Sequence, residues 1–204
     1  MIVDSTGLQL RGAGEWLFEK HGTAKRPAWR KLHIGIDAAS GEIVAFDLTD
    51  KDVDNASHVP ALLDQPTQVP ASFMADGAYD RAATYDAILA RNPFARFIVQ
   101  PCKGAVPGPT ATISPTLRDL HILAVDEHGR MNWQKASGYN KRSKVEAAIS
   151  RYKRVIGDTL KSRHDARRAT EVAIAVKSLN RMNERTPPTT TALLSCRCWA
   201  RLRP

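Results

Sequence analysis

Cysteine is scarce in this sequence of 204 residues, and so are patterned metal ligands. The three cysteines, Cys102, Cys196 and Cys198, are an odd number without the paired spacing of a zinc site. The six histidines are scattered, and no two of them stand at metal-ligand spacing. Neither a disulfide framework nor a metal site built from Cys or His is therefore expected.

Long hydrophobic runs are also missing. No window approaches the ~18 consecutive apolar residues of a membrane span, and the opening MIVDSTGLQL lacks the basic start and apolar run of a secretory signal. Gly12-Ala13-Gly14 resembles part of a dinucleotide fingerprint, but the third glycine and the following helical pattern are missing. The sequence therefore predicts a cytoplasmic protein with no membrane partner, and the dinucleotide interpretation is discarded.

Positive charge is what the chain has in excess, and it is concentrated in one region. The formal net charge is +9, and residues 135–168 hold eleven Lys or Arg against three acids, a net charge of +8. This concentration favours a polyanionic partner, and nucleic acid before a membrane because no long amphipathic membrane helix accompanies it. The alternative is a pair of solvated basic helices.

Hydrophobic periodicity predicts a mixed α/β domain. Residues 31–37 and 42–49 alternate apolar and polar side chains around the turn 38–41, which is the clearest β-hairpin in the chain. Further strands are expected at 2–6, with Asp4 at the strand's end, and at 72–75 and 96–100. Helices are expected from a cap at Asp54 or Asn55 to Leu63, at 81–92 after a cap at Asp80, and at 143–157 and 166–183.

The remaining segments carry weaker patterns. Residues 101–119 are rich in Pro, Gly and Thr and are interpreted as a loop, whereas 121–126 fit either a strand or a helical turn. The segment 11–29 interleaves basic and aromatic residues, which fits a DNA-contacting flap or a plain surface hairpin. The domain is expected to span residues 1–185, and residues 186–204 are expected to be a disordered tail.

One basic segment has an unusual helical face. Tyr139, Arg142, Glu146 and Lys153 follow one another at spacings of three, four and seven, which places them on one side of an α-helix. A single carboxylate surrounded by phosphate-binding groups suggests a metal held beside a polyanion. The alternative role for the two cations is to support the helix, at about 0.2–0.5 kcal/mol per pair.

Three motifs resemble one known family. VDST, MADGAYD and the pattern Y-x2-R-x3-E-x6-K together are similar to the bacterial insertion-sequence transposases of the IS-five type, within the IS-four superfamily. The resemblance covers residues 2–183. It implies a ribonuclease-H-like fold, a mixed sheet flanked by helices, with a DDE metal triad formed by Asp4, Asp76 and Glu146.

The resemblance also implies a chemistry. The three acids would be the catalytic residues and would hold two Mg²⁺ ions, for which Mn²⁺ can substitute. The reaction would be DNA cleavage at the element ends and transfer of the freed 3′-hydroxyl into target DNA. Tyr139, Arg142 and Lys153 match the DNA-binding positions of the signature, and synapsis of two DNA ends implies a homodimer.

The sequence departs from the family before Asp4, where members carry a long further segment that recognises the element's terminal repeats. We therefore expect an amino-terminally truncated copy that depends on a separately encoded amino-terminal part. Two other functions stay open: a catalytically inactive DNA-binding remnant, and a nuclease or resolvase on the same fold. Asp37, Asp47 and Asp80 are expected to be structural.

Overall fold

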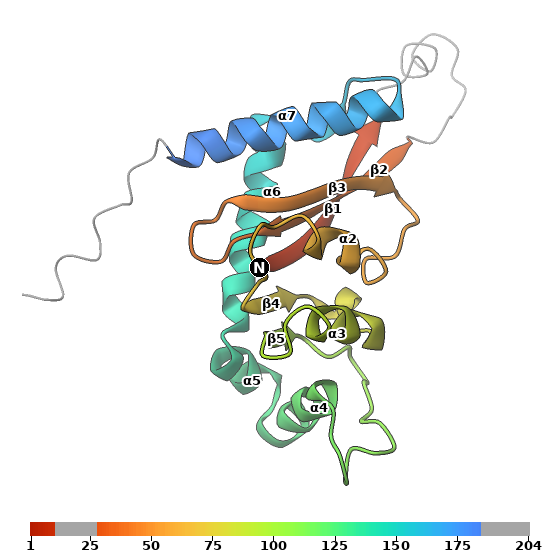
Figure 1. Cartoon of the computed structure of the whole chain (residues 1–204), viewed down its shortest axis with the longest axis vertical. Helices are drawn as coiled ribbons and strands as arrows, with labels where there is room; N and C mark the ends of the chain where they lie inside the picture. Colours follow the sequence, from red (N-terminus) through yellow and green to blue (C-terminus); the bar gives the residue numbers. More distant parts are fainter. Residues whose placement is uncertain (11–27, 185–204) are drawn as a thin grey trace, which may run out of the picture.

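The computed structural model describes residues 1–10 and 28–184 (Figure 1). Two expectations fall on the other residues. The flap or hairpin at 11–29 lies outside the described residues apart from its last two positions, and the tail at 186–204 lies wholly outside them.

Within the described ranges, six strands form one mixed sheet. They are β1 (Ile2–Leu10), β2 (Trp29–Ile36), β3 (Ile43–Asp50), β4 (Ser72–Ala75), β5 (Arg96–Val99) and β6 (Thr159–Leu160). The strand order is β3-β2-β1-β4-β5, with β6 pairing on β1. The β1–β2 and β2–β3 pairs are antiparallel, whereas β1–β4, β4–β5 and β1–β6 are parallel. The predicted mixed α/β fold is confirmed.

Helices cover both faces of this sheet. The helical segments are α2 (Val59–Leu63), the 3₁₀ turn η1 (Gly77–Tyr79), α3 (Ala82–Leu89), α4 (Leu117–His128), α5 (Arg130–Ser137), the 3₁₀ turn η2 (Tyr139–Arg142), α6 (Ser143–Val155) and α7 (Asp165–Glu184). α6 runs along the molecule, with α7 near one end and α4 and α5 at the other (Figure 1). None of the helices in the described ranges is long and apolar enough to cross a membrane.

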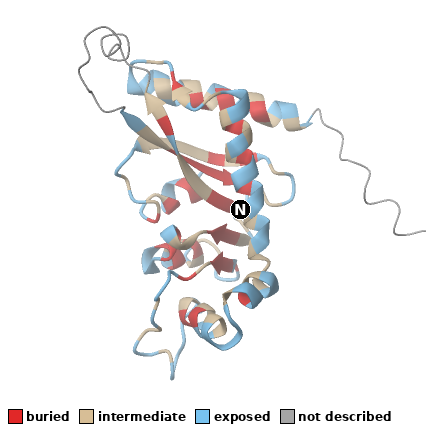
Figure 2. Ribbon diagram, turned by 180° about the vertical axis from the view of Figure 1, so that it is seen from behind, coloured by how far each residue is buried: buried red, intermediate tan, exposed pale blue. Residues whose placement is uncertain are grey.

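Alternation along β1 divides the core into two layers. Ile2 and Leu8 point to one face, where they pack with residues of α6 and α7 such as Tyr152 and Leu179. Met1 and Val3 point to the opposite face, where they pack with residues of α2 and α3. Because side chains of a strand alternate between faces, the central strand is buried on both sides. Figure 2 shows this burial concentrated on the strands.

Three predicted boundaries were wrong. β1 continues to Leu10, because it pairs with β2 along its length, so Asp4 lies inside the strand and not at its end. The helix expected from Asp54 or Asn55 begins only at Val59, since Asp54 instead closes a turn by accepting a hydrogen bond from the Ser57 N–H. Asp80 does not cap α3, whose N-cap position is Arg81.

The region after β5 holds two helices that periodicity did not predict. α4 begins after Thr116, whose hydroxyl accepts from the Asp119 N–H while Asp119 accepts from the Thr116 N–H. This reciprocal capping box is visible in the sequence as T-x-x-D before an apolar run. Gly129, at φ +79°, separates α4 from α5. Tyr139–Arg142 is a 3₁₀ turn, so Tyr139 does not share one α-helix with Glu146.

A buried histidine lies in the middle of the sheet. His33 of β2 is fully buried. Its Nε2 is 3.0 Å from the hydroxyl of Thr49, and its Nδ1 has no partner in the described part of the chain. The pKa of His33 is lowered from its ordinary 6.5 to about 4, chiefly by burial and then by His58 and Lys31, while Asp47 acts in the opposite direction.

We predict that His33 makes the protein less stable in mild acid. Because the pKa is lower in the folded state than in the unfolded state, the stabilisation is complete above about pH 6.5 and is lost as the pH falls toward 4. The free energy of unfolding should drop by about 3 kcal/mol from this residue alone. Urea unfolding of wild type and His33→Gln between pH 7 and 4 measures the effect, and parallel pH profiles would contradict it.

Candidate active site

The sheet register places two of the predicted acids side by side. Ile2 of β1 lies opposite Met74 of the parallel strand β4. Two residues further along both strands, Asp4 and Asp76 therefore stand next to each other, on the same face as Ile2 and Met74. Both of those hydrophobic residues pack in the core beneath α6. The two carboxylates are thus directed toward α6.

The third acid comes from α6 itself. Val145, Ala148 and Tyr152 are buried and hold one side of this helix against the sheet. Glu146 follows Val145 in the first turn, and its side chain is 55% exposed. One turn earlier, Arg142 stands at the N-cap position of α6.

Arg142 joins all three acids. Its Nη2 donates to Oδ2 of Asp4 at 2.7 Å and to Oδ2 of Asp76 at 3.4 Å, and its Nη1 donates to Oε1 of Glu146 at 2.5 Å. Its Nε is buried and has no hydrogen-bond partner within the described residues. We call these four residues the Arg142 cluster. It brings together three carboxylates from three different elements around one cation.

The electrostatics of the Arg142 cluster are unbalanced. Burial raises the pKa of Asp4; Arg142 and the Ser5 N–H oppose this shift, and Asp76 and Glu146 add to it. Burial alone lowers the pKa of Arg142, but Asp4, followed by smaller contributions, raises it above its ordinary value. One arginine facing three acidic residues gives the cluster a formal excess of negative charge. This excess favours binding of a further cation.

The two other signature residues lie differently. Tyr139 is half-buried against Trp133, with ring centroids 5.6 Å apart. Burial raises the pKa of Tyr139, Arg142 lowers it and the three acids raise it, which places its hydroxyl in the field of the Arg142 cluster. Lys153 is two helical turns beyond Glu146, about 10 Å along α6. It has no hydrogen bond or ion pair to any described residue, and its DNA-binding role stays a prediction.

The donors of the Arg142 cluster suit a hard divalent cation, but their arrangement does not. Carboxylate oxygens are the ligands that Mg²⁺ prefers. In the described part of the chain, however, no group of three or more His, Cys, Asp or Glu is spaced to hold a metal ion. In the Arg142 cluster, the guanidinium takes one oxygen of each acid. A metal would therefore require Arg142 to release them.

A second ion pair fixes the turn that carries Asp76. Asp80 is fully buried at its side chain and accepts from Arg118 twice, at 2.9 Å to Oδ1 and 3.1 Å to Oδ2. It also accepts from the Cys102 N–H at 3.2 Å, while the Cys102 thiol donates to the Gly77 carbonyl at 3.0 Å. At the start of the turn, Oδ1 of Asp76 accepts from the Ala78 N–H at 2.9 Å. The position of Asp76 thus depends on contacts with the segment 102–118.

Sequence reasoning missed Arg118. The residue lies 38 positions from Asp80, and no local pattern links the two. Asp80 itself was expected to be structural, which agrees with its contacts, although the expected contact was a helix cap.

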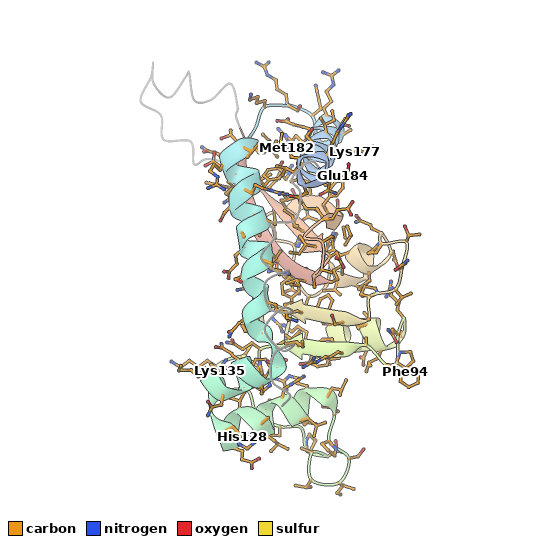
Figure 3. All side chains as sticks on the ribbon, turned by 90° about the vertical axis from the view of Figure 1, so that its left-hand side faces the viewer. Phe94, His128, Lys135, Lys177, Met182 and Glu184 are labelled. Atoms are coloured by element: carbon orange, nitrogen blue, oxygen red, sulfur yellow. The ribbon has the colours of Figure 1, made fainter. Side chains whose placement is uncertain are left out.

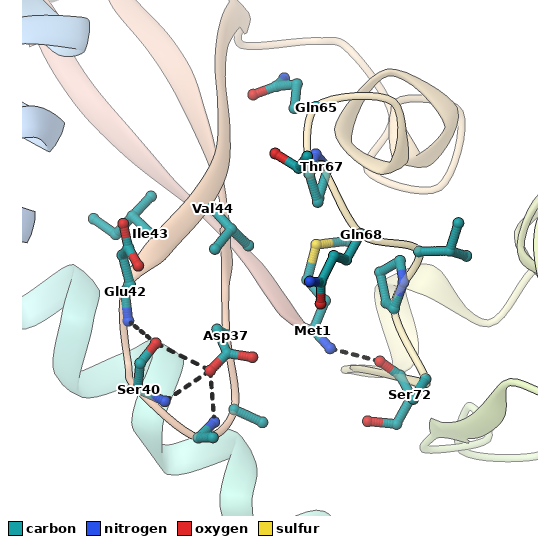
Figure 4. Close-up of a pocket in the computed structure, with 16 residues that line it drawn as sticks. Met1, Asp37, Ser40, Glu42, Ile43, Val44, Gln65, Thr67, Gln68 and Ser72 are labelled. Carbon is teal, nitrogen blue, oxygen red and sulfur yellow. Dashed lines mark hydrogen bonds between the residues drawn. The ribbon is translucent and has the colours of Figure 1, made fainter.

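A pocket of about 740 Å³ lies apart from the Arg142 cluster. It is bordered by the β2–β3 turn and residues 65–72, and it includes none of the predicted site residues (Figure 4). At its edge the Met1 amino group donates to the Ser72 carbonyl at 2.6 Å, and Asp37 organises the turn by accepting from the Ala39 and Ser40 N–H groups. These contacts are structural, so the chemistry is assigned to the acids and not to this cavity.

Comparison with known protein families gives one match. A family model described as a transposase DDE domain matches residues 1–181. The matched range includes every residue of the Arg142 cluster, as well as Tyr139, Lys153 and the Asp80–Arg118 pair.

We predict that Arg118→Met lowers the free energy of unfolding by about 2–4 kcal/mol, because it leaves the buried Asp80 carboxylate without its cation. The double variant Asp80→Asn with Arg118→Met should recover at least about 1 kcal/mol of this loss, since the uncompensated charge is gone. Urea unfolding measures both values. Arg167→Met, an exposed arginine on α7, is the matched control. Equal losses in the single and double variants would contradict the proposed charge pairing.

Proposed function

Since this chain belongs to the family of transposase DDE domains, we propose that it cleaves DNA at the ends of an insertion sequence of the IS-five type and joins the freed 3′-hydroxyl to target DNA. One observation carries the proposal. Asp4 of β1, Asp76 in the turn after β4 and Glu146 of α6 converge on a single cationic group. Three clustered acids can supply the oxygen ligands for the metal ions of two-metal phosphoryl transfer.

The three acids are the proposed holders of the divalent ions. Mg²⁺ or Mn²⁺, when bound, supplies activation of the attacking oxygen and charge stabilisation of the leaving oxygen. The chain's own contribution is to fix the carboxylates. Pairing of β1 with β4 sets the separation of Asp4 and Asp76, and burial of Val145 and Tyr152 sets the height of Glu146 above them.

The basic segment 135–168 supports a DNA partner. Seven of the eleven cations in residues 135–168 are exposed. They are Lys135, Lys141, Lys144, Arg154, Lys161, Arg163 and Arg167. Exposed Lys and Arg bind phosphates with release of counterions and without sequence preference. We assign these exposed cations to binding of both element ends and target DNA, in a homodimer that pairs two ends.

A second function is favoured by one observation. No group of three or more acids in the described part of the chain is spaced to hold a metal ion. This observation favours a DNA-binding remnant without catalysis, which would keep the same fold and the same exposed cations. A nuclease on this fold would share the acids but produce no joined DNA.

We predict nicking of supercoiled DNA that requires Mg²⁺ or Mn²⁺. Asp4→Asn, Asp76→Asn and Glu146→Gln should each lower the nicking rate by at least about 100-fold, because each removes one charged oxygen donor from the reacting centre. Gel analysis of plasmid forms measures the rate. Asp86→Asn, an exposed acid on α3, is the matched control and should nick at the wild-type rate.

The products of this assay separate the alternatives. Covalent joining of a pre-cut element end to the plasmid identifies strand transfer, whereas nicks without joined products identify a nuclease. Well-folded protein that binds DNA and shows no metal-dependent cleavage would overturn the catalytic proposal in favour of the remnant.

We also predict that Lys153 contributes one phosphate contact. Lys153→Gln should reduce the slope of log K against log salt concentration by about 1, equally for unrelated DNA sequences. Fluorescence anisotropy with a short duplex measures this slope. Lys177→Gln is the matched control, because Lys177 is exposed on α7 near the end of the molecule opposite α4 and α5 (Figure 3). An unchanged slope in Lys153→Gln would contradict the assignment.

A further inference from the structure

The Arg142 cluster contains a competition for oxygen atoms. Arg142 donates to Oδ2 of both Asp4 and Asp76 and to Oε1 of Glu146. The other oxygens of the two aspartates are already used by the backbone. Oδ1 of Asp4 accepts from the Ser5 N–H at 2.8 Å, and Oδ1 of Asp76 accepts from the Ala78 N–H at 2.9 Å.

On the two aspartates, the oxygens that carry no backbone hydrogen bond are therefore the ones that Arg142 holds, and a divalent ion competes with Arg142 for them. Mg²⁺ needs its oxygen ligands at about 2.0–2.1 Å in near-octahedral geometry. A guanidinium N–H directed at the same lone pairs occupies that space and repels the ion through its positive charge. Taking the Oδ1 atoms instead would break the hydrogen bonds that order the backbone after Asp4 and Asp76.

Arg142 is also incompletely satisfied where it lies. Its Nε is buried without a partner among the described residues, whereas its two Nη atoms bind the acids. A buried donor without a partner lowers the stability of the arrangement that holds it. The unpaired Nε therefore lowers the free energy needed to move the Arg142 side chain away from the acids.

We propose that Arg142 is an internal counter-ion that competes with divalent cations for Asp4, Asp76 and Glu146, so that the side chain leaves the acids when a metal binds. The inference rests on the proposed function, in which these acids hold the metal. An anion that attracts the released guanidinium, such as a DNA phosphate, then strengthens metal binding. By linkage, metal strengthens binding of that anion by the same factor.

The first test measures Mn²⁺ binding directly, by titration calorimetry on the whole chain without DNA. Arg142→Gln should bind Mn²⁺ at least about tenfold more tightly than wild type, a change of about 1.4 kcal/mol. Lys141→Gln is the matched control, since it removes the same charge from the adjacent, exposed position, which contacts none of the three acids. It should change the affinity by less than about threefold, the effect of general charge alone.

A second measurement uses the wild-type protein, so it does not depend on whether Arg142→Gln folds. In wild-type protein labelled with ¹⁵N-arginine, the Nε–H signal of Arg142 should shift on titration with Mg²⁺, because the side chain changes partners. Arg142→Lys identifies that signal by its loss. A third measurement adds a short duplex, which should raise the Mn²⁺ affinity of wild type and leave that of Arg142→Gln unchanged.

The outcomes separate this inference from the proposed function. If wild type, Lys141→Gln and Arg142→Gln bind Mn²⁺ equally tightly and the wild type nicks DNA, the proposed competition between Arg142 and metal is overturned. The catalytic proposal then stands. An Arg142 signal that stays fixed while Mg²⁺ binds would overturn it as well. No Mn²⁺ binding by any of the folded variants would overturn the proposed metal site itself.

Discussion

The arrangement of the site depends on one constraint: three carboxylates lie close together although their negative charges repel. Asp4, Asp76 and Glu146 share one guanidinium, and Asp4 is nearly buried, so its charge is poorly hydrated. Without a cation, repulsion between these carboxylates would destabilise the packing of α6 against the sheet. Arg142 offsets this cost from within the chain. Under the proposed function a divalent ion would take the place of Arg142 at these oxygens, so contacts that stabilise the site without metal would oppose metal binding.

The two aspartates are held more firmly than the glutamate. Asp4 lies in the central strand, between β2 and β4, and Asp76 starts a turn that Asp80, Arg118 and Cys102 fix from behind. Glu146 stands on the first turn of a helix with its side chain more than half exposed. Catalytic groups that are fixed before substrate binds lose little freedom in the reaction. The sheet thus supplies the rigid part of the site, and the start of α6 supplies the adjustable part.

Residues 101–137 support the site from outside it. It provides Arg118 and Cys102 to the turn after β4, and Trp133 packs beside Tyr139 at the beginning of the basic segment. Two parts of the site are therefore supported by one segment that carries none of its acids. Several of its large apolar residues, Leu120, Leu123 and Met131 among them, are exposed, and nothing among the described residues covers them.

Local patterns were sufficient for much of the fold. The hairpin of β2 and β3, the strands β4 and β5, and the helices α6 and α7 follow from periods of two and 3.6 residues. The three acids that the structure brings together stand in the motifs that carry the family resemblance, and their catalytic role stays a prediction. Tertiary structure decided the rest. Two of the three acids that Arg142 contacts, Asp76 and Asp4, are 66 and 138 residues away in sequence, and Arg118 is 38 residues from Asp80. Such pairs depend on strand register and on the packing of helices against the sheet, and sequence spacing carries no record of either. The DNA-binding role that the family resemblance implies for Arg142 stays a prediction; what the tertiary structure adds is the contact of Arg142 with the three acids.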